Sequence, residues 1–113
     1  MKLEGVTTRP RHGVVFEVME SVSKCGGAIL DHQQYSNQLL RVSTEIRATR
    51  LDGLLAGLAE AGVTLSQDSM DDATAEATER TRETREARMA GTLVIRFVSD
   101  EPDLRIQTPA VPG

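Results

Sequence analysis

The stretch from residue 8 to residue 31 most constrains how this chain folds, because it reads as a loop, an amphipathic helix, a glycine break and a buried strand in succession. Its apolar side chains recur at the spacing of one helical face. They are Val14, Val15, Val18, Met19, Val22 and Cys25. Gly26 and Gly27 then predict a left-handed end to the helix, and residues 28–30 begin an apolar strand. The stretch therefore predicts a helix that runs into a sheet.

The composition predicts a single domain, residues 1–113, with an aliphatic core. Of its residues 39% are hydrophobic, enough for one modest core, but the chain has only two Phe, one Tyr and no Trp. Cys25 is the only cysteine, which excludes an intrachain disulfide and fits a reducing cytoplasm. The sequence has no apolar run of transmembrane length and no signal-peptide core. We therefore expect a soluble, cytoplasmic protein that does not bind a membrane.

Charge argues against one class of partner. The formal net charge is −4 and the pI is near 5.1. Nonspecific binding to nucleic acid needs a clustered positive field that displaces counterions from the phosphates. We therefore expect no nucleic-acid partner.

Two strand patterns follow one another in the first half of the chain. Residues 2–8 form a short candidate strand, and residues 28–36 form a second whose later part is polar. Ser36 and Asn37 predict a turn. Residues 38–47 then alternate, with one apolar-rich face made by Leu40, Val42, Thr44 and Ile46. Strands separated by so short a turn predict an antiparallel hairpin.

A second helix completes a familiar order of elements. Apolar residues at helical spacing run through residues 51–61, where Gly53 and Gly57 would permit close packing against the sheet, and Gly62 ends the helix. Residues 63–66 form a last short strand. Over residues 1–68 this order predicts an α+β, ferredoxin-like βαββαβ sandwich, with two helices on one face of a four-stranded antiparallel sheet.

The composition shifts after residue 68. Residues 69–91 carry many charges and few large apolar side chains, so we expect either a solvent-exposed helix or a partly ordered excursion. Residues 92–99 alternate as an extra strand, which we expect at one edge of the sheet or paired with another chain. Residues 100–113 read as a coil tail, in which Leu104 to Ile106 offer a short edge strand.

Few residues suggest chemistry. Arg9, Arg11 and His12 lie before the first helix, where free amide groups favour an anion such as a carboxylate, although a solvated loop is the other interpretation. Asp31 and His32 are neighbours on a strand and point to opposite faces, so they do not form a catalytic pair. Cys25 ends an apolar stripe and is expected to be buried. No zinc-type spacing and no phosphate-binding glycine loop is present. We expect no enzyme activity, metal or cofactor.

The run of Thr8, Arg9, Pro10 and Gly13 before a helix, with Gly26 to Asp31 after it, resembles the opening of an ACT domain, the ligand-sensing module of amino-acid metabolism. The resemblance covers about residues 1 to 68. It implies a βαββαβ homodimer that binds an amino acid or another small anionic ligand beside the loop before the first helix. The ligand-binding residues expected from the loop, its charges and this resemblance are Thr8, Arg9, Arg11, His12, Gly13, Ala28, Ile29 and Asp31.

Three functions can be considered from the sequence, and the third, a small enzyme on a ferredoxin-like scaffold, lacks a nucleophile, base and orienting group within one site. Two functions therefore remain. One is an ACT-like regulatory module that senses a small molecule, and the other is a structural or protein-interaction module of the same fold without such a ligand. A homodimer is expected in either case. Leu39 lies on the outer face of the third predicted strand, and a two-layer sandwich leaves that sheet face uncovered unless a partner or the extra segment closes it.

Overall fold

A computed structural model describes residues 1–35 and 38–98 of the chain. Nine elements follow one another: β1 (Lys2–Thr7), α1 (Arg11–Lys24), β2 (Ala28–Tyr35), β3 (Leu39–Arg47), the 3₁₀ turn η1 (Ala48–Arg50), α2 (Leu51–Glu60), β4 (Thr64–Leu65), α3 (Gln67–Glu83) and β5 (Arg88–Phe97). The predicted turn at Ser36 and Asn37, the coil tail and the short strand at its Leu104 lie outside the described residues.

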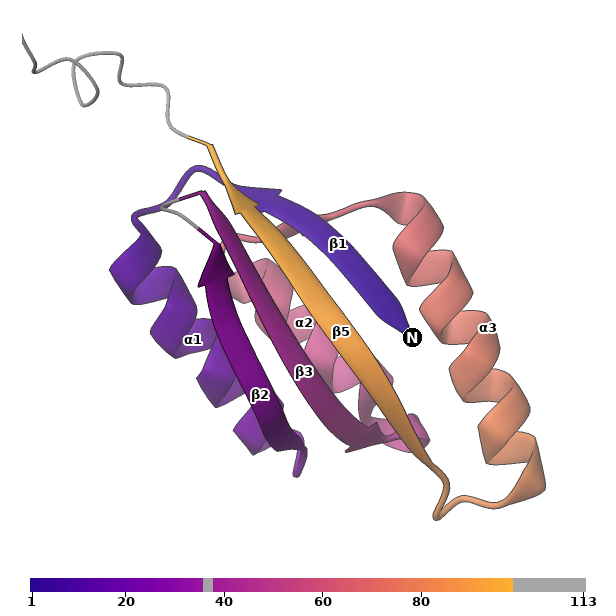
Figure 1. Cartoon of the computed structure of the whole chain (residues 1–113). Coiled ribbons are helices and arrows are strands. Elements are labelled where there is room, and N and C mark those ends of the chain that lie inside the picture. The colour runs from indigo at the N-terminus through magenta and orange to yellow at the C-terminus, as the bar shows by residue number, and fades with distance from the viewer. Residues whose placement is uncertain (36–37, 99–113) are drawn as a thin grey trace, which may run out of the picture.

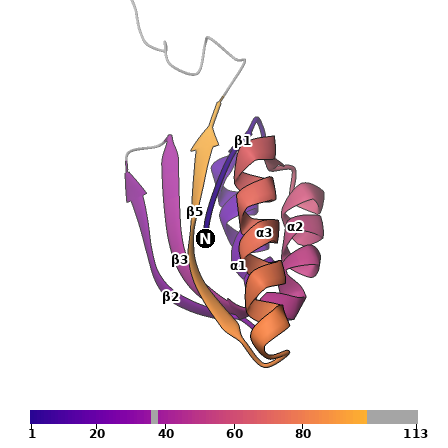
Figure 2. The same ribbon diagram turned by 90° about the vertical axis from the view of Figure 1, so that its right-hand side faces the viewer.

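The protein is an α+β sandwich of two layers. Its five strands form one sheet in the order β2-β3-β5-β1-β4 (Figure 1). The helices α1, α2 and α3 all lie on the same face of that sheet, and the opposite face is left open (Figure 2). The prediction of an α+β fold with the first two helices on one face is confirmed.

The predicted four-stranded antiparallel sheet with an extra edge strand is wrong. β5 lies in the centre, antiparallel to β3 and parallel to β1, so the sheet is mixed. Two strands, β3 and β5, therefore lie between the parallel strands β1 and β2. The physical reason is burial: Met89, Leu93 and Ile95 are at most 1% exposed, which requires a strand that is flanked on both sides and covered by helices.

The charged segment after residue 68 is an ordered helix that packs on the sheet. α3 buries Ser69, Ala73 and Ala77, which recur every four residues, and lies beside β1. Ser66 caps it, since its Oγ accepts a hydrogen bond from the Ser69 amide at 3.2 Å. Because the buried residues are small, the helix approaches the sheet without a large apolar stripe. The β5 strand then begins at Arg88, earlier than predicted.

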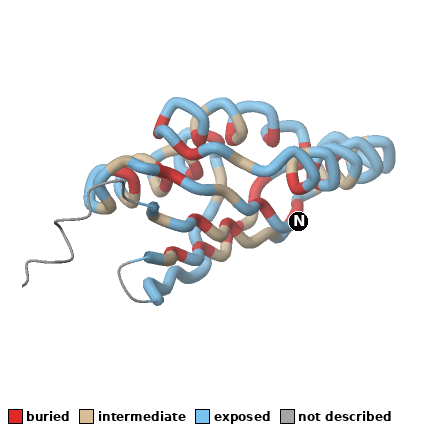
Figure 3. The backbone as a smooth tube through the Cα atoms, turned by 90° about the horizontal axis from the view of Figure 1, so that it is seen from above, coloured by how far each residue is buried: buried red, intermediate tan, exposed pale blue. Residues whose placement is uncertain are grey.

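The core is aliphatic, as predicted. Its fully buried large side chains come from both layers, and buried positions recur along the strands and helices (Figure 3). They are Leu3, Leu40, Ile46, Leu54, Leu58, Met89, Leu93, Ile95, Val14, Val18, Val22 and Val42. Within the described ranges, every helix is too short or too polar to cross a membrane.

Two glycines shape the packing of α1, since one ends the helix and the other lets α2 approach it closely. Gly26 has a φ of +74° and ends α1 in the left-handed conformation that the sequence predicts. Gly57 packs against another helix and not against the sheet as expected, because a Cβ there would lie 2.8 Å from Ser21 Oγ of α1. The first two helices thus approach each other closely at Gly57.

Candidate functional site

The loop between β1 and α1 is held by one arginine. The Arg9 guanidinium donates two parallel hydrogen bonds to the Glu17 carboxylate, each 2.9 Å long. Its Nη1 also donates to the carbonyl oxygen of Ala61, at the end of α2. Arginine at a helix C-terminus satisfies a carbonyl that has no partner within the helix. The side chain therefore joins the loop, α1 and the end of α2.

The electrostatics of Arg9 follow from this pairing. The hydrogen bond from Arg9 lowers the pKa of Glu17, although partial desolvation opposes the effect. The same bond raises the pKa of Arg9. The aliphatic stem of Arg9 covers Gly62, where a Cβ would lie 2.4 Å from Arg9 Cδ. An anionic ligand would have to displace Glu17 to reach this guanidinium, so we assign Arg9 a structural role.

The remaining loop residues lie in or beside the first turn of α1. The helix begins at Arg11, earlier than predicted, after Pro10 as an N-cap that has no side-chain hydrogen bond. His12 and Gly13 are exposed there, and Thr8 is exposed just before the turn. The structure therefore leaves Thr8, His12 and Gly13 exposed to solvent beside the start of α1.

The second group of predicted ligand-binding residues lies elsewhere. Ala28, Ile29 and Asp31 begin β2, after the C-terminal end of α1. The helix has 14 residues and is therefore about 20 Å long. The structure thus separates these three residues from the loop by the length of a helix and does not bring the predicted site together within one chain.

The residues considered for catalysis are also apart. Asp31 is paired with Ser43 and His32 with the buried Val42, so the two side chains point to opposite faces of the sheet. Cys25 is buried, and burial raises the pKa of its thiol, partly opposed by the charge of Arg50. Across residues 1–35 and 38–98, no group of three His, Cys, Asp or Glu side chains is placed to hold a metal ion.

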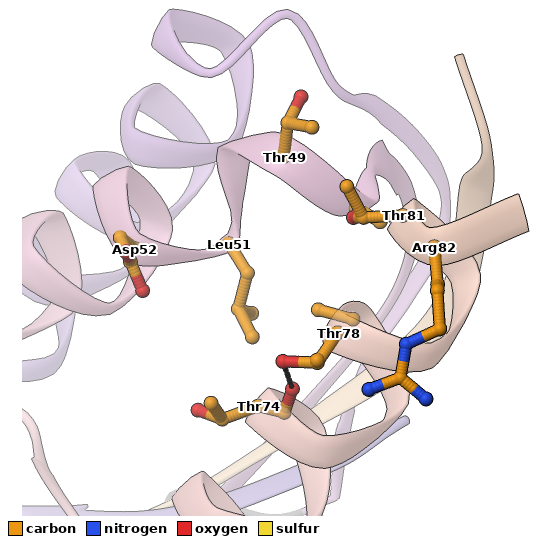
Figure 4. Close-up of a pocket in the computed structure, with 9 residues that line it drawn as sticks. Thr49, Leu51, Asp52, Thr74, Thr78, Thr81 and Arg82 are labelled. Atoms are coloured by element: carbon orange, nitrogen blue, oxygen red, sulfur yellow. Dashed lines mark hydrogen bonds between the residues drawn. The ribbon is translucent and has the colours of Figure 1, made fainter. Parts of the chain in front are cut away.

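One hollow of about 450 Å³ lies between α3 and the start of α2 (Figure 4). Its floor is apolar and its rim carries threonine hydroxyls. The lining residues are Ala48, Thr49, Leu51, Asp52, Thr74, Ala77, Thr78, Thr81 and Arg82. Thr78 donates to the carbonyl of Thr74, and Arg82 pairs with Glu79 at 3.4 Å. These polar groups are engaged within α3 and form no nucleophile with an adjacent base.

A second hollow, of about 410 Å³, lies on the open face of the sheet. It is bordered by β1, β3, β4 and β5. The lining residues are Glu4, Gly5, Val6, Leu39, Thr64, Leu65, Ser66, Val94 and Arg96. Arg96 has no local sequence feature that indicates a role. The alternation of residues 92–99 places Arg96 on the face opposite the buried one. The residues beside Arg96 depend on β5 lying between β3 and β1, and this position is not evident from the sequence.

The edge strand β2 is the other exposed feature. All eight of its residues are exposed, among them Ile29 at 36%, Leu30 at 60% and Tyr35 at 45%. A bulge between Ile29 and Asp31 interrupts its pairing with β3. One edge of the sheet therefore presents a long strand with apolar side chains to solvent.

Comparisons with protein-family models, with curated proteins and with solved structures find no match for this chain. Its function has to be inferred from the geometry.

Proposed function

We propose that the protein is a non-enzymatic interaction module that works as a homodimer joined through β2. The observation that carries this proposal is the exposure of β2 along its whole length at the edge of the sheet. Proteins normally protect such an edge with lysine, proline or a cover, because its free amide and carbonyl groups pair with another strand. β2 contains neither lysine nor proline. A bulge is another common protection, but the one in β2 lies between Ile29 and Asp31 and leaves residues 31–35 regularly paired.

The side chains of β2 favour a second copy as the partner. After the bulge, residues 31–35 pair regularly with β3 and offer a straight outer edge. Two antiparallel copies related by a two-fold axis at Gln33 set Asp31 opposite Tyr35 of the second copy, and His32 opposite Gln34. Carboxylate then meets hydroxyl and imidazole meets amide, with no like charges opposed. An axis at Asp31 would oppose two carboxylates, which disfavours that register.

Light scattering tests the homodimer. We expect wild type to have twice the 12.3 kDa mass of one chain. Gln33→Lys should give monomers, because it sets two positive charges opposite each other at the two-fold axis of the paired edge. Phe16→Lys is the matched control: Phe16 is 65% exposed on α1, away from β2, and its change should leave the dimer intact. A monomeric wild type, or equal effects of the two substitutions, would refute the β2 interface.

A second candidate is the ACT-like sensing of an amino acid. With β5 set aside, the strands follow the order β2-β3-β1-β4, with α1 and α2 side by side on one face. This order supports a ferredoxin-like scaffold into which β5 has been inserted. The exposed first turn of α1, with His12 and Gly13, then offers amide groups to a ligand carboxylate.

A thermal-shift screen against the common amino acids tests sensing. A ligand that binds only the folded chain raises its melting temperature. We expect stabilisation by at least one amino acid, and its loss in His12→Glu, which adds a negative charge beside the exposed turn. Glu20→Gln, a change farther along α1, serves as the control. An unchanged melting temperature with every amino acid at millimolar concentration counts against sensing and leaves the dimer proposal standing.

A further inference from the structure

The open face of the sheet carries a compact group of side chains that the dimer proposal does not use. Arg96 on β5 is paired with Leu39 on β3 and with Val6 on β1. Arg41 is paired with Val94, the next open-face residue along β5. Directly paired residues share a face of a sheet, so these five side chains are neighbours. We call them the Arg96 patch: Val6, Leu39, Arg41, Val94 and Arg96.

Within the part of the chain that the structure describes, the two arginines of the patch are not paired with an acidic side chain. In residues 1–35 and 38–98, ion pairs on this face join Lys2 to Glu4, Arg88 to Glu45 and Arg47 to Glu86, each at 3.3 Å. Among the described residues, neither Arg41 nor Arg96 forms an ion pair, and both are exposed. As diagonal neighbours across two strands, they lie roughly 7 Å apart at their Cα atoms. Side chains at such neighbouring positions on one face can both reach a single bound carboxylate, with which arginine forms charge-assisted hydrogen bonds.

Beside Arg96 the face is hollowed. The open-face hollow described above is bordered by Val6, Leu39 and Val94, and also by Glu4, Thr64 and Ser66. The Glu4 carboxylate is paired with Lys2 at 3.3 Å. Val6 is 45% exposed, although it belongs to a central strand. An arginine among apolar side chains, next to a shallow hollow, is the composition of the energetic centre of many protein interfaces.

We propose that the Arg96 patch binds an acidic segment of a partner protein. Carboxylates of the segment pair with Arg41 and Arg96, and an adjacent aliphatic side chain enters the hollow beside Arg96. The patch lies on the open face, whereas the proposed dimer uses the outer edge of β2. The two interfaces can therefore be tested independently.

The surrounding charges favour a polypeptide over a nucleic acid. Glu4, Asp31 and Glu45 lie on the same face as the two arginines, at the positions paired with Val94, Ser43 and Ala90. A continuous phosphate backbone would meet these carboxylates. A peptide places its negative charges at separate points and avoids them.

The test measures binding of a fluorescein-labelled peptide in which leucine is flanked by glutamates, by fluorescence anisotropy with the full chain. We expect saturable binding that weakens with salt and falls about tenfold in Arg96→Gln and in Arg41→Gln, the loss typical of one charged hydrogen bond. Arg85→Gln is the matched control, because Arg85 is exposed in the connection before β5 and its removal changes the net charge equally. It should bind as wild type.

Four outcomes would overturn the proposal. They are no saturable binding to wild type, equal binding of the same peptide with glutamine in place of glutamate, equal losses in the Arg85 control, and tighter binding of a single-stranded oligonucleotide of matched charge. Both arginines are exposed, so melting temperatures within a few degrees of wild type are expected for the variants. Light scattering on the same samples reports the dimer, so that its failure is distinguished from failure of the patch.

Discussion

Two glycines on α2 provide a matched test of how closely the first two helices pack. Gly57 faces α1, where a Cβ would lie 2.8 Å from Ser21 Oγ and 3.0 Å from Ser21 Cβ. Gly53, one turn earlier, faces Cys25, and its Cβ would make an ordinary contact with Sγ at 3.5 Å. Alanine in a helix is about 1 kcal/mol more favourable than glycine. The same substitution therefore meets a clash at one site and an ordinary van der Waals contact at the other.

The expected difference can be worked from these contacts. Gly53→Ala should gain up to about 1 kcal/mol in unfolding free energy. Gly57→Ala receives the same gain, but forcing a methyl group into a closed contact costs about 1–3 kcal/mol. Ser21 Oγ also donates to the Glu17 carbonyl at 2.9 Å, which restrains it from moving aside. The two variants should thus differ by about 1–3 kcal/mol, with Gly53→Ala the more stable.

Urea unfolding followed by circular dichroism measures this difference. A double-mutant cycle with Ser21→Gly adds a direct test, because that change removes both atoms that the new methyl group meets. Gly57→Ala should then cost less in the Ser21→Gly background than in wild type. The reasoning is wrong if Gly57→Ala is as stable as Gly53→Ala, or if the Ser21 change leaves the cost of Gly57→Ala unaltered.

Three further predictions follow from the described contacts. Gly27→Ala should lower the unfolding free energy by about 1–3 kcal/mol, because its Cβ would lie 2.5 Å from Ile46 Cγ2. Gly26→Asn should cost little, because Gly26 has a left-handed backbone and open space around it. The urea midpoints of the two variants measure this difference in stability. Ala73→Leu should destabilise by about 1–3 kcal/mol because Ala73 is 1% exposed, and Ala75→Leu on the exposed side should change stability by about 0.5 kcal/mol at most; equal melting temperatures would contradict the packing of α3. The hydrogen bond from Arg9 lowers the pKa of Glu17 in the folded chain, so the ionised Glu17 stabilises the fold above its ordinary pKa of 4.5, and this contribution is lost as the pH falls through the lower folded value. The difference in urea midpoint between wild type and Glu17→Gln should therefore shrink in that acid range. A difference that stays constant with pH would contradict the Arg9 pair.

Local patterns predicted the elements whose burial depends on a single face. The valines of α1 recur at helical spacing, and Val14, Val18 and Val22 are indeed buried. The start of that helix was placed too late, because Pro10 fixes an extended N-cap and Arg11 to Gly13 fit a first turn without an apolar residue. α3 was harder to predict. Its buried stripe is made of Ser69, Ala73 and Ala77, which reach the core by close approach and carry almost no hydrophobic signal.

The candidate site was less predictable than the fold, because its partners are distant in sequence. The loop arginines suggested an anion site, since nothing local reveals that Arg9 bonds to Glu17 and to Ala61, which lies 52 residues later. Arg41 and Arg96 carried no signal at all. They become neighbours only because β3 and β5 are paired, and that pairing is set by the whole sheet.

The polarity of β5 and β2 in the sequence indicates where each strand lies in the sheet. Residues 92–98 are apolar on both alternating faces except at Thr92 and Arg96, whereas residues 31–35 are polar apart from Tyr35. A strand flanked on both sides tolerates apolar residues on both faces, whereas an edge strand is exposed to solvent and carries more polar residues. This contrast favours β5 in the centre and β2 at the edge. The polar half of β2 is therefore explained by its exposed edge and needs no ligand, and the surfaces left for a partner are that edge and the Arg96 patch beside the central strand.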